Sequence, residues 1–450
     1  MYKPYKKPVS TVFPDVKIPE FRISRLVLFV VQIIGRIYLY TIIGAAKIVL
    51  GNGQMLFNVF RRALEGKSRA LIAFRHPNGG EPQILMWYIL IRMQKDAKKA
   101  GVKFCRKPFA HFVSGYEVLR WGGAVTRWAL AGTGALPVYH SKVDKAGMDR
   151  IHKAVRDGPY PVAIAPEGQV SYNTETVPRL EQGTVRIGFR AAEELEKNGI
   201  DSPVEIVPVS FHLRYGNKGR RSLYKLLRVI EKYTGFKDDG AGLTVRLVRS
   251  RDFILAQNEK RYGIIPEASQ GFNARVAILL EAALAKAEKI IDIKARSSDH
   301  FERLYYIRQC CWDRIIVPGL IGLDKIAPLE RSIMDLHAGE AWHASRHMEL
   351  ADFVWYFRIP APEPDAPLHI LIEYAQNLFD FANRTMGGAY PDRVSIFPRK
   401  VIIQSGPVIN LSERLPSYRA DRKTAIAAAM GDLEKAYLDC IKESEGSERS

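Results

Sequence analysis

The sequence predicts an α/β fold: a largely parallel sheet flanked by helices, with membrane-anchoring helices at the N-terminus and a mostly helical C-terminal region. Apolar runs alternate with helical patterns after residue 69, which is typical of a parallel sheet. A long apolar stretch near the N-terminus follows several basic residues. The 450 residues are 47% apolar and 26% charged, so the chain can bury a substantial core.

The alternating region defines the expected elements of the sheet domain. Predicted strands cover residues 70–74, 135–139, 162–165, 205–211 and 243–248. Predicted helices cover residues 83–99, 145–156, 183–197 and 220–233. An amphipathic helix over 270–291 would close this domain.

The C-terminal region has a different pattern. Residues 297–389 are rich in aromatic residues and histidine and mostly helical in pattern. A strand and turn over 399–407 and a helix over 422–442 follow, an arrangement that repeats the one expected for 243–291. We therefore expect three parts. A basic leader with membrane-associating helices covers residues 1–55, an α/β domain expected to be catalytic covers 56–292, and a mostly helical region of unknown role covers 293–450.

Residues 26–50 are long enough to span a bilayer, but Gln32, Arg36 and Lys47 interrupt them. A charge at the bilayer centre costs roughly 2.5–3.5 kcal/mol. These interruptions favour an interfacial or re-entrant anchor on the cytoplasmic face over a span, and a buried pair of core helices is the alternative. Basic residues that would face anionic lipid precede the stretch: Lys3, Lys6, Lys7, Arg22 and Arg25.

The net charge of +19 indicates a polyanionic partner: nucleic acid, an anionic membrane surface or a phosphorylated substrate. The sequence contains no recognised nucleic-acid-binding module with interleaved aromatic residues, so no nucleic-acid partner is expected. The four cysteines form no C-x-x-C motif, which is typical of a reduced compartment.

The strongest candidate for chemistry is the segment from His76 to Glu81, which directly follows the predicted strand 70–74. A histidine acts as a general base when a carboxylate fixes its tautomer and stabilises the imidazolium. The intervening Pro-Asn-Gly-Gly turn can bring the two side chains together, because glycine accepts tight backbone dihedrals. The alternative is a histidine that merely caps the following helix.

Four blocks in order resemble the glycerolipid acyltransferase family, which includes the lysophosphatidic acid acyltransferases. The segment from His76 to Glu81 resembles the family's H-x4-D motif, with glutamate in place of aspartate. The other blocks are Gly134-Ala-Leu-Pro-Val-Tyr-His140, Ala165-Pro-Glu-Gly-Gln-Val-Ser171 and Val207-Pro208-Val209. The resemblance covers roughly residues 20 to 290, and the order of the blocks is more specific than any one of them.

The resemblance implies an O-acyltransferase that moves a fatty acyl group from acyl-CoA or an acyl-carrier protein to a lysophospholipid or related glycerolipid hydroxyl. His76 would be the base and Glu81 its partner, while Glu167 and Gly168 would help to bind the acceptor. No cofactor or metal is implied. The chain lacks G-x-S-x-G, so an acyl-serine route has no support.

Two departures from the family concern arginines that are associated with the acceptor phosphate. His140 and Val170 occupy their positions, and valine cannot pair with phosphate. His140, Lys142 and Arg179 are the residues expected to supply the missing charge. The acceptor headgroup therefore stays open, and a non-catalytic membrane-surface scaffold that retains the fold is the alternative function.

Two other clusters of residues each have a functional and a purely structural interpretation. His337, His343 and His347 lie in a helical pattern whose spacing would allow a metal site, although a polar helix face is expected. A basic loop with Arg214, Lys218, Arg220 and Arg221 is expected after the Val-Pro-Val strand, either touching headgroups or CoA phosphates or simply solvated.

Overall fold

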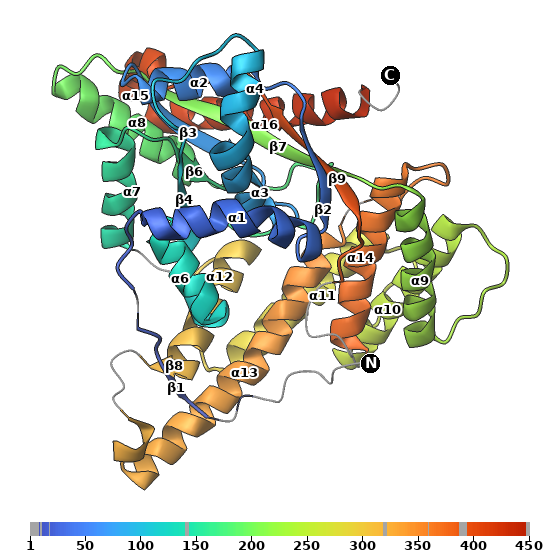
Figure 1. Cartoon of the computed structure of the whole chain (residues 1–450). Coiled ribbons are helices and arrows are strands. Elements are labelled where there is room, and N and C mark those ends of the chain that lie inside the picture. The colour runs from blue at the N-terminus through green and yellow to red at the C-terminus, as the bar shows by residue number, and fades with distance from the viewer. Residues whose placement is uncertain are drawn as a thin grey trace. The chain divides into compact units, whose positions relative to one another are not determined.

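The computed structural model describes residues 9, 11–17, 19–139, 144–317, 322–358, 360–386 and 394–446. The chain forms two compact units, each assembled from segments distant in the sequence (Figure 1). The α/β unit comprises residues 18–216 and 398–450, and the helical unit comprises 1–17 and 217–397. The expected boundaries after residues 55 and 292 differ from this division, because residues 18–55 belong to the α/β unit and residues 217–292 to the helical unit. The last strands and helices of the chain also belong to the α/β unit.

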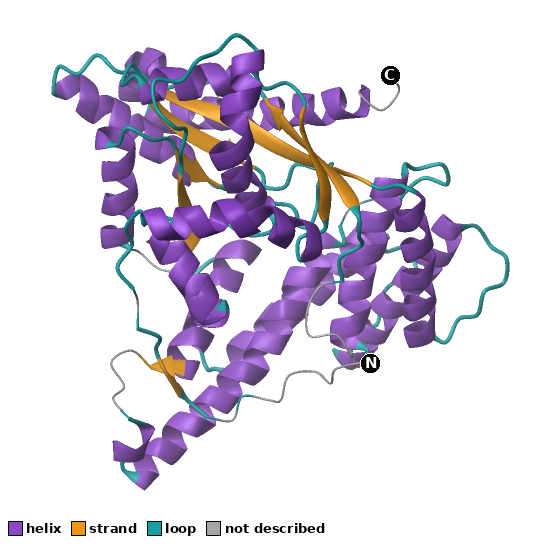
Figure 2. Cartoon of the chain, viewed as in Figure 1, coloured by secondary structure: helices purple, strands orange, loops and turns teal. Residues whose placement is uncertain are grey.

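Within the described residues, eight strands form one mixed sheet in the α/β unit, ordered β2-β9-β7-β3-β6-β4-β5 with β10 paired to β7. Strands β3 to β7 are mutually parallel, whereas β9 runs antiparallel to β7 and parallel to β2. The expected largely parallel sheet is confirmed, and its strands are drawn in orange in Figure 2. They are β2 (Ala45–Leu50), β3 (Arg69–Phe74), β4 (His111–Gly115), β5 (Leu136–Val138), β6 (Val162–Ile164), β7 (Val204–Arg214), β9 (Arg399–Ser405) and β10 (Ile409–Asn410).

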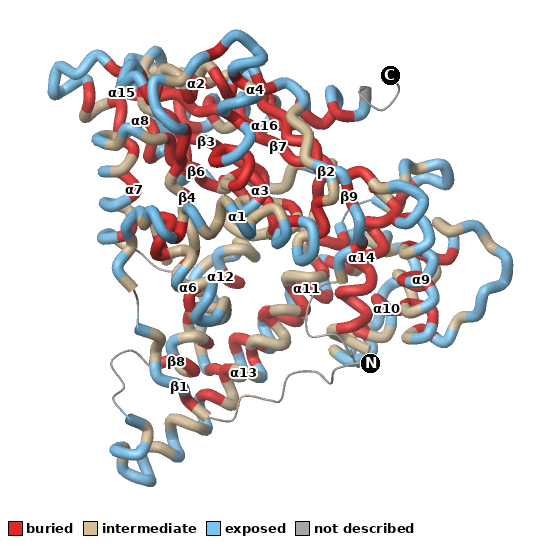
Figure 3. Tube along the Cα trace, viewed as in Figure 1, coloured by how far each residue is buried: buried red, intermediate tan, exposed pale blue. Residues whose placement is uncertain are grey.

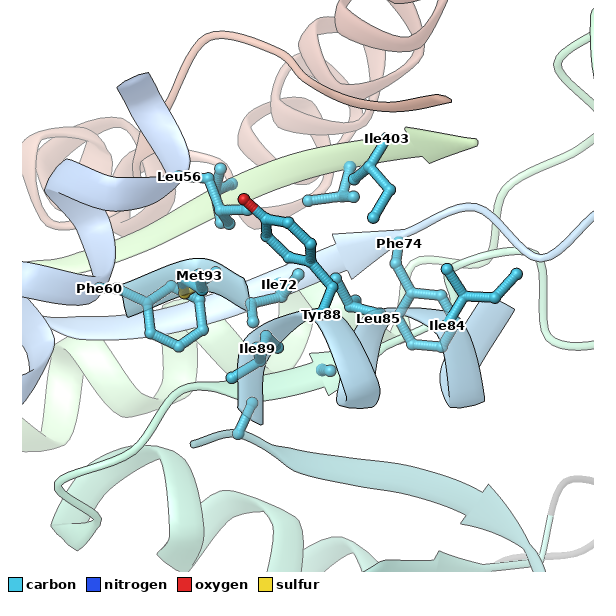
Figure 4. Close-up of a cluster of buried hydrophobic side chains, with 14 of the residues drawn as sticks. Leu56, Phe60, Ile72, Phe74, Ile84, Leu85, Tyr88, Ile89, Met93 and Ile403 are labelled. Atoms are coloured by element: carbon cyan, nitrogen blue, oxygen red, sulfur yellow. The ribbon is translucent and has the colours of Figure 1, made fainter. Parts of the chain in front are cut away.

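Helices cover both faces of this sheet. Side chains of β3 alternate between two cores, because successive residues of a strand point to opposite faces. Ile72 and Phe74 enter the core beneath α2, α3 and α4, which Figure 4 shows, and Leu71 and Ala73 enter the core beneath α7, α8 and α16. The helices of the unit are α1 (Arg25–Thr41), α2 (Gln54–Leu64), α3 (Glu81–Trp87), the π-helix η1 (Tyr88–Arg92), α4 (Met93–Lys99), α5 (Tyr116–Trp121), α6 (Gly123–Gly132), α7 (Lys145–Asp157), α8 (Gly183–Lys197), the 3-10 helix η3 (Ser412–Arg414), α15 (Leu415–Ala420) and α16 (Arg422–Gly446).

The second unit is almost entirely helical, as expected for most of the C-terminal region. Its long helix α13 packs against α11, α12 and α14. Its elements are β1 (Phe13–Pro14), α9 (Asn217–Thr234), α10 (Leu243–Arg261), α11 (Phe272–Ile290), α12 (His300–Ile315), β8 (Ile316–Val317), the 3-10 helix η2 (Leu323–Lys325), α13 (Pro328–Tyr356) and α14 (Leu368–Thr385). Strands β1 and β8 pair in parallel.

One of the five strand predictions is wrong. Residues 243–248 open helix α10 instead of forming a strand. The buried positions Leu247, Ser250 and Ile254 recur three and four residues apart, so helical periodicity outweighs the short apolar run. The internal repeat expected from this segment is wrong for the same reason, because 243–291 holds no strand.

The apolar leader divides into a helix and a strand. Helix α1 buries only Val27 and Leu39, and Figure 3 shows most of its length as intermediate or exposed. The expectation of helices throughout 26–50 is wrong for residues 45–50, which form β2 and pair with β9 from near the C-terminus. Local patterning cannot reveal a partner so distant in the sequence. In the described part of the chain, no helix combines the length and hydrophobicity needed to cross a membrane.

Candidate active site

The His76 segment lies where β3 ends, at the edge of the sheet where the neighbouring parallel strand β6 also ends. The segment after β6 carries Glu167, whose Oε2 accepts a hydrogen bond from the backbone N–H of His76 at 3.0 Å. In return, the backbone N–H of Ser171 donates to the carbonyl of His76 at 3.1 Å. Two of the blocks singled out in the sequence therefore meet, because parallel strands bring their carboxyl ends to one edge.

The expected contact between His76 and Glu81 is present. His76 Nδ1 lies 2.9 Å from Glu81 Oε2. The same carboxylate accepts the backbone N–H of Asn78 at 3.1 Å and of Gly79 at 2.9 Å. Gly79 has a φ of 86°, which favours glycine and folds the chain back toward His76. Since a carboxylate accepts and does not donate, Nδ1 is the donor in this contact, and in the neutral imidazole Nε2 then carries the lone pair.

The imidazole and the carboxylate differ in their access to solvent. The His76 side chain is 19% exposed, whereas the Glu81 side chain is 2% exposed. Nε2 of His76 makes no hydrogen bond to any residue that the structure describes. The ring also contacts Phe74 edge-on, with centroids 6.0 Å apart. The buried carboxylate therefore orients a histidine whose free nitrogen lies at the surface.

Arg75 is a part of this site that sequence reasoning missed. Its side chain is 1% exposed, and its Nε donates to Glu167 Oε1 at 2.7 Å. Its two Nη atoms donate to three backbone carbonyls of the loop after β6, those of Asn173, Thr174 and Thr176. A buried ion pair with further hydrogen bonds holds this loop against the end of β3. The only sequence signal was a charged residue directly after a buried strand.

Glu167 is occupied on both of its oxygens, by Arg75 Nε and by the N–H of His76, and its side chain is 1% exposed. These contacts make it a positioning residue for the His76 backbone. Acceptor binding by Glu167 is a prediction that the contacts do not test.

Gly168 forms the turn that follows, with its N–H bonded to the carbonyl of Ala165 at 3.2 Å. Its φ is 70°, in the left-handed region that favours glycine, and a Cβ at this position would also require the exposed Glu181 carboxylate to shift. Val170 approaches the turn between His76 and Glu81, because its Cγ2 would lie 3.8 Å from a Cβ at Gly79.

The structure says less about the remaining predicted binding residues, Arg179, His140 and Lys142. Arg179 is exposed on the loop between β6 and α8. His140 and Lys142 lie outside the described residues. The phosphate-binding role expected of these three residues stays a prediction.

A buried histidine, His212 on β7, contrasts with the partly exposed His76. His212 Nδ1 lies 2.8 Å from Glu175 Oε2, and Arg214 Nη1 donates to Glu175 Oε1 at 2.7 Å. Burial opposes ionisation of Glu175, yet His212 and Arg214 together lower the pKa of its carboxyl to about 2. The His212 side chain has no exposed surface, whereas the His76 side chain is 19% exposed. Arg214, expected in a basic surface loop, is instead buried in β7, and this prediction is wrong.

The histidines His337, His343 and His347 lie on helix α13. No group of three or more histidine, cysteine, aspartate or glutamate side chains in the described ranges is arranged to hold a metal ion. Comparison with models of known protein families and with curated proteins found no match for this sequence.

Proposed function

We propose that this protein is a membrane-associated O-acyltransferase that moves a fatty acyl group from an acyl-CoA or acyl-carrier thioester to the hydroxyl of a lysophospholipid or related glycerolipid. The observation that carries the proposal is the His76–Glu81 pair, with Nδ1 bonded to a buried carboxylate at 2.9 Å and Nε2 left at the surface. The order of the four acyltransferase-like blocks in the sequence supports it.

In the proposed reaction, His76 Nε2 removes the proton of the acceptor hydroxyl as its oxygen attacks the thioester carbonyl carbon. A C–O bond forms, and the tetrahedral intermediate collapses with cleavage of the C–S bond. The departing thiolate takes the proton from the imidazolium, so histidine ends as it began. Glu81 stabilises the imidazolium, and no covalent acyl-enzyme is needed.

Membrane association is part of the proposal, and the outer face of α1 supports it. Large apolar side chains on this helix are exposed, among them Leu26, Phe29, Ile33 and Ile37, with exposed fractions of 57–65%. Arg25 at the start of the helix is also exposed. An amphipathic helix of this kind lies in the membrane interface, with its basic residues toward anionic headgroups. We place the protein at the cytoplasmic face on this basis.

The acceptor is proposed to be a lysophospholipid or another lipid alcohol. Val170 lies beside the His76 turn where the family has an arginine, so one guanidinium that would pair with a phosphate monoester is missing. His140, Lys142 and Arg179 are the proposed sources of charge for a headgroup. A panel of lyso-acceptors with different headgroups, analysed by mass spectrometry of the products, identifies the acceptor.

The test measures thiol release and acylated product with the purified protein in detergent, with acyl-CoA or acyl-carrier protein as donor. We expect His76→Ala to lower the rate by about 10² to 10⁴-fold, because general base catalysis is lost. His300→Ala, at the partly exposed first residue of helix α12, is the matched control and should leave the rate unchanged.

Glu81 variants separate orientation from donor binding. Glu81→Gln should lower kcat more than it changes the KM for the donor, and Glu81→Asp should retain more activity than Glu81→Gln because it keeps the charge. Full activity of His76→Ala would exclude its role as base. No turnover by the unmodified protein with any donor or acceptor would instead favour the non-catalytic scaffold.

A further inference from the structure

A cavity of about 590 Å³ that is open to solvent lies among helices α10, α11, α13 and α14 of the helical unit. Four cationic side chains line it, one from each helix: Arg261, Lys286, Arg346 and Arg384. The carboxylate among its lining residues is Glu349. The volume is within the range of pockets that bind small molecules, roughly 300–1,000 Å³.

Among the residues that line this cavity, four side chains are cationic and one is a carboxylate. Arg346 Nη2 donates to Glu349 Oε1 at 2.6 Å, which compensates one cation. Lys286 is exposed and forms no ion pair with any residue in the described ranges. Arg261 donates to the backbone carbonyl of Thr385, which orients its guanidinium but supplies no countercharge. Like charges gathered around one volume repel, so an anion there would stabilise them.

The neutral groups of the cavity also suit a polar ligand. His347 lines it, and Tyr262 hydrogen-bonds to its Nδ1. Burial, the charge of His343 and that of Lys286 lower the pKa of His347 to about 4, so it is uncharged at neutral pH. The indole of Trp342 lies in the lining under the Arg346 guanidinium, 4.8 Å from ring centroid to Cζ. An aromatic ring and a planar cation together form a surface for stacking.

We propose that this cavity binds a small phosphorylated ligand. Three arginines and a lysine approach from separate helices, and the planar guanidinium matches the oxygens of phosphate in bidentate geometry. The cations surround a volume instead of lying on one flat face, which favours a small molecule over a membrane surface. The proposal does not depend on acyl transfer at His76, because every residue in it belongs to the helical unit.

Titration calorimetry on the full-length protein with pyrophosphate and with ADP tests the proposal. Lys286→Gln should weaken binding about tenfold, because it removes one charge-assisted contact. Lys289→Gln is the matched control: Lys289 is exposed on the same helix α11 but does not line the cavity. Its affinity should equal that of the unmodified protein.

The two probes distinguish the source of the phosphate. Equal affinities mean that phosphate alone is recognised, and tighter binding of ADP means that the base stacks in the cavity; both outcomes support the proposal. Binding of neither probe to the unmodified protein would overturn it. An equal loss of affinity in Lys286→Gln and Lys289→Gln would also overturn it, since that result indicates unspecific attraction to a basic surface.

Discussion

Gly79 has the backbone conformation that allows Glu81 to reach back to His76. Its φ of 86° lies in the left-handed region, and its N–H donates to Glu81 Oε2 at 2.9 Å. A Cβ at this position would meet only Val170 Cγ2, at an ordinary contact distance of 3.8 Å. A side chain here would therefore strain the backbone without crowding its surroundings.

Gly79→Ala tests this role against Gly66→Ala, a glycine in the same unit with a φ of 76° and nothing within 4 Å of its Cβ position. Each replacement should lower the free energy of unfolding by about 1 kcal/mol, because L-residues are strained in this region. Gly79→Ala alone should also lower the rate of acyl transfer, by about tenfold. Urea unfolding and the thiol-release assay measure the two effects, and equal rates for the two variants would contradict the assignment.

The ion pair between Arg75 and Glu167 holds the backbone at His76 in place. Both side chains are 1% exposed, and together they join the end of β3 to the loop after β6. Removing one partner would leave the other charge buried without compensation, which costs several kcal/mol. Neither residue need contact a substrate to affect the chemistry at His76.

At the scale of elements, helix α1 has an apolar face without a partner in its own unit. Val27 and Leu39 are buried, whereas Ile33 and Ile37 are 57% and 64% exposed. Its C-terminal half is tied to the sheet, because Arg36 donates to the carbonyls of Ala45 and Ala46 in β2. A helix held in place in this way can present its apolar face to a membrane interface without crossing it.

Replacing Ile33 and Ile37 together by glutamate should weaken binding to vesicles that contain anionic lipid by at least about tenfold, since each apolar side chain contributes about 1.5–3 kcal/mol when buried. The free energy of unfolding should change by less than about 0.5 kcal/mol, because both positions are exposed. Ile265→Glu is the control, because Ile265 is 92% exposed in the helical unit. If vesicle sedimentation shows the same membrane binding for the double variant and for the control, α1 is not the membrane-binding element.

At the scale of the whole molecule, the C-terminal segment completes the α/β unit. Strand β9 lies between β2 and β7, and helix α16 packs against the sheet. The Tyr437 hydroxyl donates to the carbonyl of Ala73 at 2.9 Å, and its ring lies 5.9 Å from the Arg75 guanidinium. The end of the chain therefore supports the strand that carries His76.

Neighbouring residues of α16 provide a matched test of this support. Tyr437 has no exposed surface, whereas Leu438 is 42% exposed. Tyr437→Ala should lower the free energy of unfolding of the α/β unit by about 3–5 kcal/mol, because a large buried ring is lost. Leu438→Ala should cost less than about 0.5 kcal/mol. Urea unfolding measures both, and similar small losses would mean that α16 is dispensable to the unit.

The sequence by itself determined the features that depend on neighbouring residues. The apolar run of β3, the helical periodicity after it and the glycine turn from His76 to Glu81 are all local, so their pattern predicts them. Residues 243–248 show the limit of this reasoning, because a short apolar run fits a helix as well as a strand.

Only the tertiary structure decided which distant segments meet. The pairing of β2 with β9, the Arg75–Glu167 contact and the place of α16 join residues far apart in the chain. The free energy of these contacts comes from burial and hydrogen bonding between partners that no local pattern identifies. For this reason the sequence pointed to His76 and Glu81, and only the fold revealed the buried ion pair that holds the backbone of His76.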